Sequence, residues 1–269
     1  MKTLRTIDEL RRALRPLREG GGIALVPTMG ALHAGHAALL GTARRECRVV
    51  VASVFVNPAQ FSDPADLATY PSELAADEKL AAACGVDILF APAAAELYPP
   101  GYATWIEPAG VAEGLESDHR PGHFRGVATV CVKLFGIVSP TIAYFGRKDA
   151  QQVAVVKQIV RDLNIELEVR VVDTVREPDG LALSSRNRLL SPAERRVAAA
   201  IPRALATRDP ERARAALARA GIDAEYVAIA DLDGPTLALA ARIGSTRLID
   251  NVRLEHARLE CARRDGEAR

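Results

Sequence analysis

The sequence predicts an α/β protein in which a mostly parallel sheet is covered by helices on both faces. Two observations support this fold class. Short, nearly continuous apolar runs rich in β-branched residues alternate with longer helical patterns over roughly the first 176 residues, as expected for parallel strands buried on both faces. In addition, 49% of the 269 residues are hydrophobic and 26% are charged, a balance typical of a globular protein.

The first segment is expected to be a charged amphipathic helix. Leu4, Ile7, Leu10 and Leu14 recur on one side of it, at helical spacing. Its acidic residues distinguish it from a mitochondrial presequence, and it does not resemble a secretory signal. No apolar run in the sequence is long enough to cross a bilayer, so we expect no membrane partner.

Five apolar runs are expected to form strands, with four helical patterns between them. The strands are expected at residues 23–27, 49–56, 86–90, 141–145 and 166–175, and the helices near residues 36–46, 72–84, 126–138 and 150–163. Gly85 follows the second of these helices, where a glycine commonly ends a helix.

The pattern changes after about residue 176. A turn cluster at residues 177–180 precedes a polar loop, an Ala/Arg-rich helical stretch and two short β-like runs at 224–230 and 246–250. We therefore predict a Rossmann-like domain at residues 1–176 and a smaller C-terminal α+β domain at residues 177–269. The charged tail after about residue 256 is expected to fray.

Charge and cysteine content restrict the classes of partner. The net charge of +1 gives no general attraction to nucleic acid or to a membrane surface, so any anion site must be local. The cysteines form no CxxC pair and lie in or beside apolar stretches, which favours reduced, mostly buried thiols over disulfides or a zinc site. This pattern favours a reducing compartment such as the cytoplasm. The cysteines are Cys47, Cys84, Cys131 and Cys261.

The most informative segment, PTMGALHAGH at residues 27–36, follows the first expected strand and opens the first expected helix. Ligands bind at the carboxyl ends of parallel strands, and a helix start offers N–H groups and a positive dipole end to phosphate. Gly30 and Gly35 would let a ligand approach the backbone. His33 and His36, three residues apart, can face one anion. Alternatively, one histidine caps the helix and the other is a surface residue.

Four further segments carry candidate polar groups. Asn57 and Gln60 follow the second strand, where neutral amides suit a small polar acid, although an Asn-Pro turn with a solvated glutamine is the alternative. Arg120 and His123 are ligand contacts or structural anchors of their loop. Lys148 and Asp149 alone would suggest a solvated ion pair, and Ser184 and Ser185 alone a cap or turn. The segments are FVNPAQF (residues 55–61), RPGHFRGV (120–127), FGRKDAQQ (145–152) and DGLALSSRN (179–187).

An HxGH motif directly after a strand resembles the signature of the nucleotidyltransferase-like superfamily, whose members promote attack on a nucleotide α-phosphate. The segments above, in this order and followed by RLIDN at residues 247–251, are similar to those of the pantothenate synthetase family over about residues 3–252. The motif set as a whole is far more specific than any single motif.

The resemblance implies an ATP-dependent ligase that activates pantoate as pantoyl adenylate and joins it to β-alanine, releasing AMP and pyrophosphate. It implies Mg²⁺ held largely by phosphate oxygens and water, with no dedicated protein metal site. It also implies a cytoplasmic homodimer with small-molecule substrates and no nucleic-acid partner. Because an acyl adenylate is labile to water, the site should close around it; the candidate lid is the junction loop near residues 184–187 with the small domain. Two rivals remain: a nucleotidyltransferase with another small acid or alcohol as substrate, and a non-catalytic nucleotide-binding protein.

The resemblance also implies roles for individual residues. His36 is the proton donor, and His33, Lys148 and Arg186 are further catalytic candidates. Gln60 and Gln152 bind pantoate, and Gln60 also binds β-alanine. The ATP-binding residues are Met29, Gly30, Ala31, Leu32, His33, Ala34, Gly35, His36, Gly146, Arg147, Lys148, Asp149, Val175, Leu183, Ser184, Ser185 and Arg186.

Three departures from the family pattern are visible. Arg147 stands where the family usually has glutamate, and this acid-to-base change could alter ATP affinity. Ala150 stands where an aromatic residue is usual. The stretch at residues 197–224 is shorter than usual, which predicts a reduced small domain.

Overall fold

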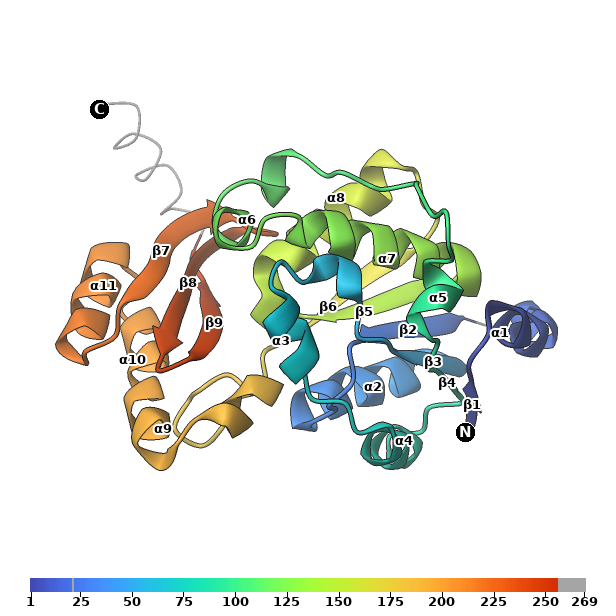
Figure 1. Ribbon diagram of the computed structural model, residues 1–269, viewed down its shortest axis with the longest axis horizontal. Coiled ribbons are helices and arrows are strands. Elements are labelled where there is room, and N and C mark those ends of the chain that lie inside the picture. The colour runs from blue at the N-terminus through green and yellow to red at the C-terminus, as the bar shows by residue number, and fades with distance from the viewer. Residues whose placement is uncertain (21, 256–269) are drawn as a thin grey trace.

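A computed structural model describes residues 1–20 and 22–255. It contains a six-stranded sheet and, beside it, a three-stranded sheet built from the C-terminal part of the chain (Figure 1). All pairings in the larger sheet are parallel and those in the smaller sheet are antiparallel. The predicted fold class is confirmed.

The strand order of the larger sheet reverses direction at β2. From β2 the chain builds outward through β3 to β4, then returns to place β5 and β6 on the other side. This reversal creates a crevice at the carboxyl ends of the strands, where ligands bind in open α/β sheets. In spatial order the strands are β1 (Lys2–Leu4), β4 (Ile88–Phe90), β3 (Val49–Val54), β2 (Ile23–Thr28), β5 (Ile142–Gly146) and β6 (Glu168–Val172).

Helices cover both faces of this sheet. Successive residues of β2 point to opposite faces: Leu25 packs in the core under α1, α7 and α8, and Val26 in the core under α2 and α4. The helices of this part are α1 (Ile7–Leu14), α2 (Ala34–Glu46), α3 (Pro64–Thr69), α4 (Leu74–Ala83), α5 (Ala94–Leu97), α6 (Glu116–His119), α7 (His123–Val138) and α8 (Ala150–Asp162). The 3₁₀ turns are η1 (Arg15–Gly20), η2 (Pro58–Gln60), η3 (Gly110–Ala112), η4 (Arg147–Asp149) and, after β6, η5 (Ser185–Leu189).

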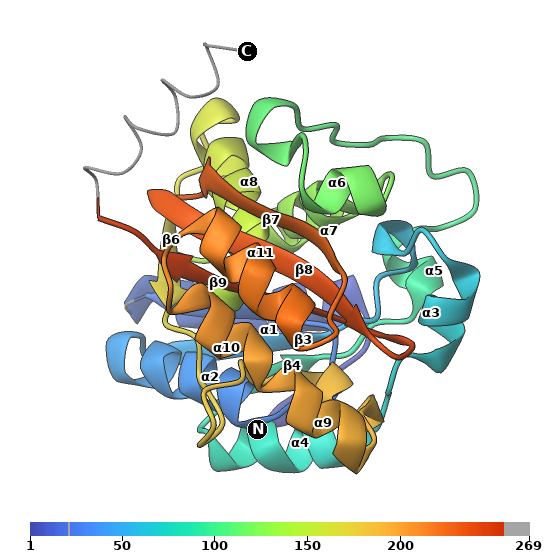
Figure 2. The same cartoon turned by 90° about the vertical axis from the view of Figure 1, so that its left-hand side faces the viewer.

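The C-terminal sheet packs against helices of its own. Its central strand β8 pairs with β7 on one side and β9 on the other, and α10 and α11 share a hydrophobic core with it (Figure 2). A smaller apolar cluster joins this sheet to α8. The elements are α9 (Pro192–Ala198), α10 (Ala200–Leu205), α11 (Pro210–Arg219), β7 (Ala224–Asp231), β8 (Pro235–Ile243) and β9 (Thr246–Arg253).

The five strands and four helices expected in the first part of the chain are present, with ends shifted by a few residues. The expectation for Leu4 was wrong, because Leu4 lies in β1, paired with Phe90 of β4. Helix α1 instead starts after Thr6, whose side chain caps it together with Glu9. The sequence prediction also missed β8. The tail from residue 256 and Cys261 lie outside the described residues.

No helix in the described part of the chain has the length and apolarity needed to cross a membrane.

Candidate active site

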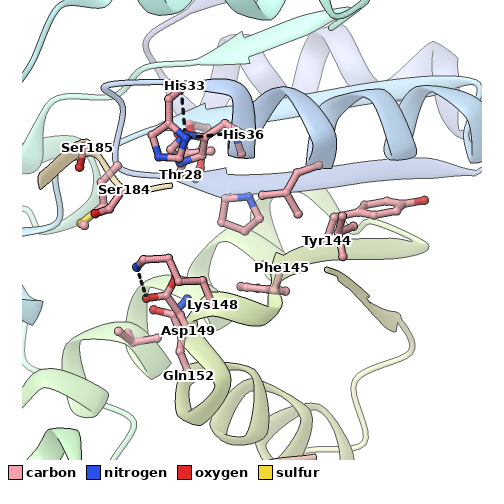
Figure 3. A pocket seen from close by; sticks show the side chains of 18 of the residues that line it. Thr28, His33, His36, Tyr144, Phe145, Lys148, Asp149, Gln152, Ser184 and Ser185 are labelled. Carbon is pink, nitrogen blue, oxygen red and sulfur yellow. Dashed lines mark hydrogen bonds and ion pairs between the residues drawn. The ribbon is translucent and has the colours of Figure 1, made fainter. Parts of the chain in front are cut away.

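A pocket lies where β2 and β5 diverge, between the start of α2 and the turn η4 (Figure 3). It brings together most of the predicted site residues from five separate segments of the chain. Those that line it are Met29, His33, Gly35, His36, Gln60, Gly146, Lys148, Asp149, Gln152, Val175, Leu183, Ser184, Ser185 and Arg186. The predicted residues Gly30, Ala31, Leu32, Ala34 and Arg147 are not among its lining residues.

His33 and His36 form a capped helix start on one side of the pocket. The Nδ1 atom of His33 accepts the Gly35 N–H at 3.1 Å, and Nδ1 of His36 accepts the His33 N–H at 3.2 Å. Because both Nδ1 atoms are acceptors, each ring carries its proton on Nε2. His33 is therefore both the helix cap and a pocket residue, which joins the two alternatives drawn from the sequence.

Both imidazoles are uncharged at neutral pH. Burial, aided by the positive charges of Lys148 and Arg188, lowers the pKa of His33 to about 4. Burial, with His33 alongside, lowers the pKa of His36 to about 3. The pair thus offers two neutral N–H donors rather than two cations, and an arriving anion would raise both pKa values.

The loop before α2 is shaped by a buried carboxylate that the sequence prediction missed. Asp77 of α4, 2% exposed, accepts the N–H of Ala31 at 3.0 Å and of Leu32 at 2.7 Å. Gly30 and Ala31 adopt positive φ angles of 87° and 51°, a conformation that is costly for alanine. These two N–H groups are therefore occupied by Asp77. In the sequence, an acid on the apolar face of an Ala-rich helix is the signal for this role.

The opposite side of the pocket carries charge. The Nζ atom of Lys148 lies 3.4 Å from Oδ1 of Asp149, and Figure 3 shows this pair, with Gln152 beside it, facing the two histidines. At another part of the rim, the Arg186 guanidinium pairs with Asp66 of α3 at 3.1 Å. The Leu183 N–H donates to the Val175 carbonyl at 2.9 Å, which ties the serine-containing segment to the stretch that follows β6.

Gln60 is held in place by Asn57 and His123 and by the close packing of α7 on η2. The Asn57 amide donates to Oε1 of Gln60 at 3.0 Å and to the Gly126 carbonyl at 3.1 Å. Nδ1 of His123 lies 3.0 Å from the Gln60 carbonyl. A Cβ atom on Gly126 would lie 2.2 Å from the Ala59 carbonyl oxygen, so α7 packs directly on η2. Asn57 and His123 therefore position Gln60.

Arg147 points away from the pocket, toward the C-terminal sheet. Its guanidinium pairs with Asp233 at 2.9 Å, and Lys157 pairs with the same carboxylate at 2.6 Å. Ala150 packs in a buried cluster with Leu232 and Ala238. Two of the three departures, Arg147 and Ala150, thus lie at one interface, between η4–α8 and the C-terminal sheet.

Few carboxylates are available for a metal ion. Within the described ranges, no three or more His, Cys, Asp or Glu residues form a cluster that could hold one. Asp149 and Asp173 are the acidic residues lining the pocket. Thr174, also in the lining, has a buried hydroxyl without a hydrogen-bond partner among the described residues, and sequence patterns did not indicate it.

Fold and site together define a parallel α/β protein with a strand-end pocket for a phosphorylated ligand. The comparisons with known proteins make the assignment specific. The model of the pantoate–β-alanine ligase family matches residues 2–253. The chain belongs to this family.

Individual relatives agree over nearly the whole chain. A pantothenate synthetase of Moorella thermoacetica is 48% identical over 95% of this chain and 99% of its own, and one of Rhizorhabdus wittichii is 50% identical over 96% and 100%. A crystal structure of pantothenate synthetase from Thermus thermophilus matches with a TM-score of 0.87 and 44% identity, over 94% of this chain and 99% of that one.

A further solved structure carries ligands. The pantoate–β-alanine ligase from Francisella tularensis, in complex with β-γ ATP and β-alanine, matches with a TM-score of 0.86 and 39% identity, over 94% of this chain and 97% of that one.

Proposed function

We propose that this protein is an ATP-dependent ligase that condenses pantoate with β-alanine through a pantoyl-adenylate intermediate, releasing AMP and pyrophosphate. The observation that carries the proposal is that one pocket contains two neutral histidine donors, Lys148 and the anchored amide of Gln60. The histidines and Lys148 suit a triphosphate, and the amide suits a small hydroxy acid.

In the first step, the pantoate carboxylate attacks the α-phosphorus of ATP and pyrophosphate leaves. The Nε2–H groups of His33 and His36 donate to phosphate oxygens as charge moves onto the leaving group. Lys148 supplies a compact positive charge. Because the pKa of His36 is about 3 in the free protein, the nucleotide meets a neutral imidazole that acts as a hydrogen-bond donor.

In the second step, the β-alanine amine attacks the activated carbonyl and AMP leaves. Gln60 and Gln152 bind pantoate, and Gln60 also contacts β-alanine. The pocket wall on α7 is apolar, formed by Val127, Val130 and Leu134. It suits the two methyl groups of pantoate, while the amides suit its hydroxyls.

The nucleotide is assigned to three segments that meet at the pocket. Residues 29–36 and 146–149 hold the phosphates, with Arg147 contributing only through its backbone. Val175 and residues 183–186 complete the site. Mg²⁺ would be held mainly by phosphate oxygens and water, with Asp149 in the pocket lining as a candidate carboxylate donor.

We further propose a division into a nucleotide- and pantoate-binding domain at residues 1–176 and a smaller lid domain at residues 177–269. The largely separate hydrophobic core around β8 supports this division. The functional state is proposed to be a cytoplasmic homodimer, as the resemblance implies.

A product assay tests the function. Purified protein is incubated with Mg-ATP, pantoate and β-alanine, each omitted in turn, and pyrophosphate, AMP and pantothenate are quantified. We expect pyrophosphate release to require pantoate, and pantothenate to require all three substrates. A nucleotide-linked product without amide formation would favour a nucleotidyltransferase, and ATP binding without pantoate-dependent pyrophosphate release would favour a non-catalytic protein.

A further inference from the structure

The turn η4, which carries Lys148, accepts hydrogen bonds from a side chain of the C-terminal sheet. The Nδ2 atom of Asn251, on β9, donates to the Arg147 carbonyl at 3.0 Å and to the Lys148 carbonyl at 2.9 Å. Asn251 is 5% exposed, so water cannot easily replace these bonds. Both donors of one buried amide are therefore used on two consecutive carbonyls of the lysine turn.

Asp250 fixes Asn251 in turn. Its carboxylate, 2% exposed, accepts the Asn251 backbone N–H at 2.8 Å and a two-pronged pair from Arg176 at 2.7 and 3.0 Å. Bidentate pairs of this kind constrain geometry strongly. Arg176 directly follows Val175, which lines the pocket. Asn251 thus connects η4 to β9, and the adjacent Asp250 connects Arg176, in the stretch after β6, to the same strand.

An ion pair between η4 and the C-terminal sheet is a second contact to the same turn. The Arg147 side chain reaches the turn between β7 and β8, where it pairs with Asp233 at 2.9 Å. The Lys148 side chain lines the pocket on the other side of η4. The backbone of η4 therefore lies between the C-terminal sheet and the pocket.

We propose that Asn251 is a positioning residue for the reaction: it fixes the backbone of Lys148 so that its ammonium group meets the phosphates of the nucleotide. The effect of Asn251 on turnover rests on the proposed ligase function. The effect on nucleotide binding is independent of whether an amide product forms. The late RLIDN segment, to which the sequence pattern attached no role, thereby acquires one.

The rival explanation is that Asn251 merely fastens the two parts of the molecule together. Tyr226 provides a matched control for that case. It lies on the same sheet, and its hydroxyl donates to Glu116 of α6 at 2.7 Å and not to η4. Tyr226→Phe removes one bond between the same two parts of the chain but leaves the lysine turn alone.

The experiment is a double-mutant cycle on the full chain, read first as the Kd for Mg-ATP by titration calorimetry. We expect Asn251→Ala to weaken ATP binding about tenfold and Lys148→Ala to weaken it at least as much, which corresponds to about 1.4 kcal/mol for each factor of ten. If Asn251 acts through Lys148, the double variant binds ATP no more weakly than Lys148→Ala alone. Tyr226→Phe should bind ATP within about twofold of the parent, by the usual scatter for independent sites.

Additive losses in the double variant, or equal losses in Asn251→Ala and Tyr226→Phe, would overturn the positioning role. Thermal unfolding of each variant identifies any that are unfolded; Asn251→Ser, which keeps one donor, then replaces Asn251→Ala in the cycle. Pyrophosphate release by the parent protein is measured in parallel. Its absence, together with a non-additive cycle in ATP affinity, would refute the ligase assignment and leave the positioning role intact.

Discussion

The ring centroids of His33 and His36 lie 4.2 Å apart, and the Nδ1 atom of each ring accepts a hydrogen bond from a backbone N–H. This arrangement presents two Nε2–H donors, and the two neutral rings add no positive charge to that of Lys148. Such fixed donors need little reorganisation when charge develops on a ligand.

Loss of one donor should therefore slow the adenylation step. We expect His36→Ala to reduce the rate of pantoate-dependent pyrophosphate release by about 10²–10³-fold, the range for removal of a preorganised donor. The variant should fold normally. His119→Ala is the matched control, because His119 lies outside the pocket and faces Glu225 at 3.8 Å. Near-parental turnover in His36→Ala would exclude the assigned role.

The protein without nucleotide should lose stability as pH falls below neutrality. The folded pKa values of His33, His36 and His123 are about 4, 3 and 4, below the usual value of about 6.5. Between these values the unfolded chain binds more protons, so the unfolding free energy decreases as pH decreases. Urea unfolding at pH 7.5 and 5.5 measures the slope, which should be shallower in His33→Asn; a pH-independent midpoint would contradict the prediction.

The Asp77 carboxylate should matter through its two acceptor oxygens. Asp77→Asn keeps the shape but turns an NH₂ group toward one of two backbone N–H groups, which leaves a buried donor unpaired. We expect a loss of about 1–3 kcal/mol in unfolding free energy and a raised KM for ATP. Glu78→Gln is the control, because Glu78 is the next residue of α4 and accepts instead from Thr3. Equal effects of both variants on KM would refute the prediction.

Arg147 is expected to be needed for stability rather than for direct ATP contact. Arg147→Glu, which restores the residue usual in the family, places a second carboxylate beside Asp233. Asp233 keeps its pair with Lys157, so we expect a loss of about 1–3 kcal/mol in unfolding free energy, seen as a lower unfolding midpoint. Arg161→Glu on the exposed face of α8 should change stability by less than about 0.5 kcal/mol. Unchanged stability with lost ATP affinity would instead indicate a direct phosphate contact.

The sequence allowed prediction of the parts that depend on local pattern. Apolar runs such as that of β3 identified the parallel strands, because strands buried on both faces are apolar throughout. The run that forms β8 is rich in alanine and leucine, residues that also favour helices, so its pattern was ambiguous. This run forms a strand because it pairs with β7 and β9, and a local sequence pattern does not contain that information.

The same distinction holds for the site. His33, His36 and Lys148 were predicted from their motifs, and the structure brings them to one pocket. Asp77 and Asn251 were not assigned roles, because their partners lie 46 and 103 residues away. The direction of the Arg147 side chain was equally out of reach, since it is set by Asp233 on a distant turn.

The anchoring of the lysine turn by β9 has a consequence for the order in which the chain is made. The partner of the Lys148 carbonyl is 103 residues further along, so the ribosome releases the six-stranded sheet and the histidine turn well before Asn251. Until Asn251 is made, its two hydrogen bonds to the carbonyls of Arg147 and Lys148 cannot form. A chain truncated before β9 should therefore lack this anchor and show no pantoate-dependent pyrophosphate release.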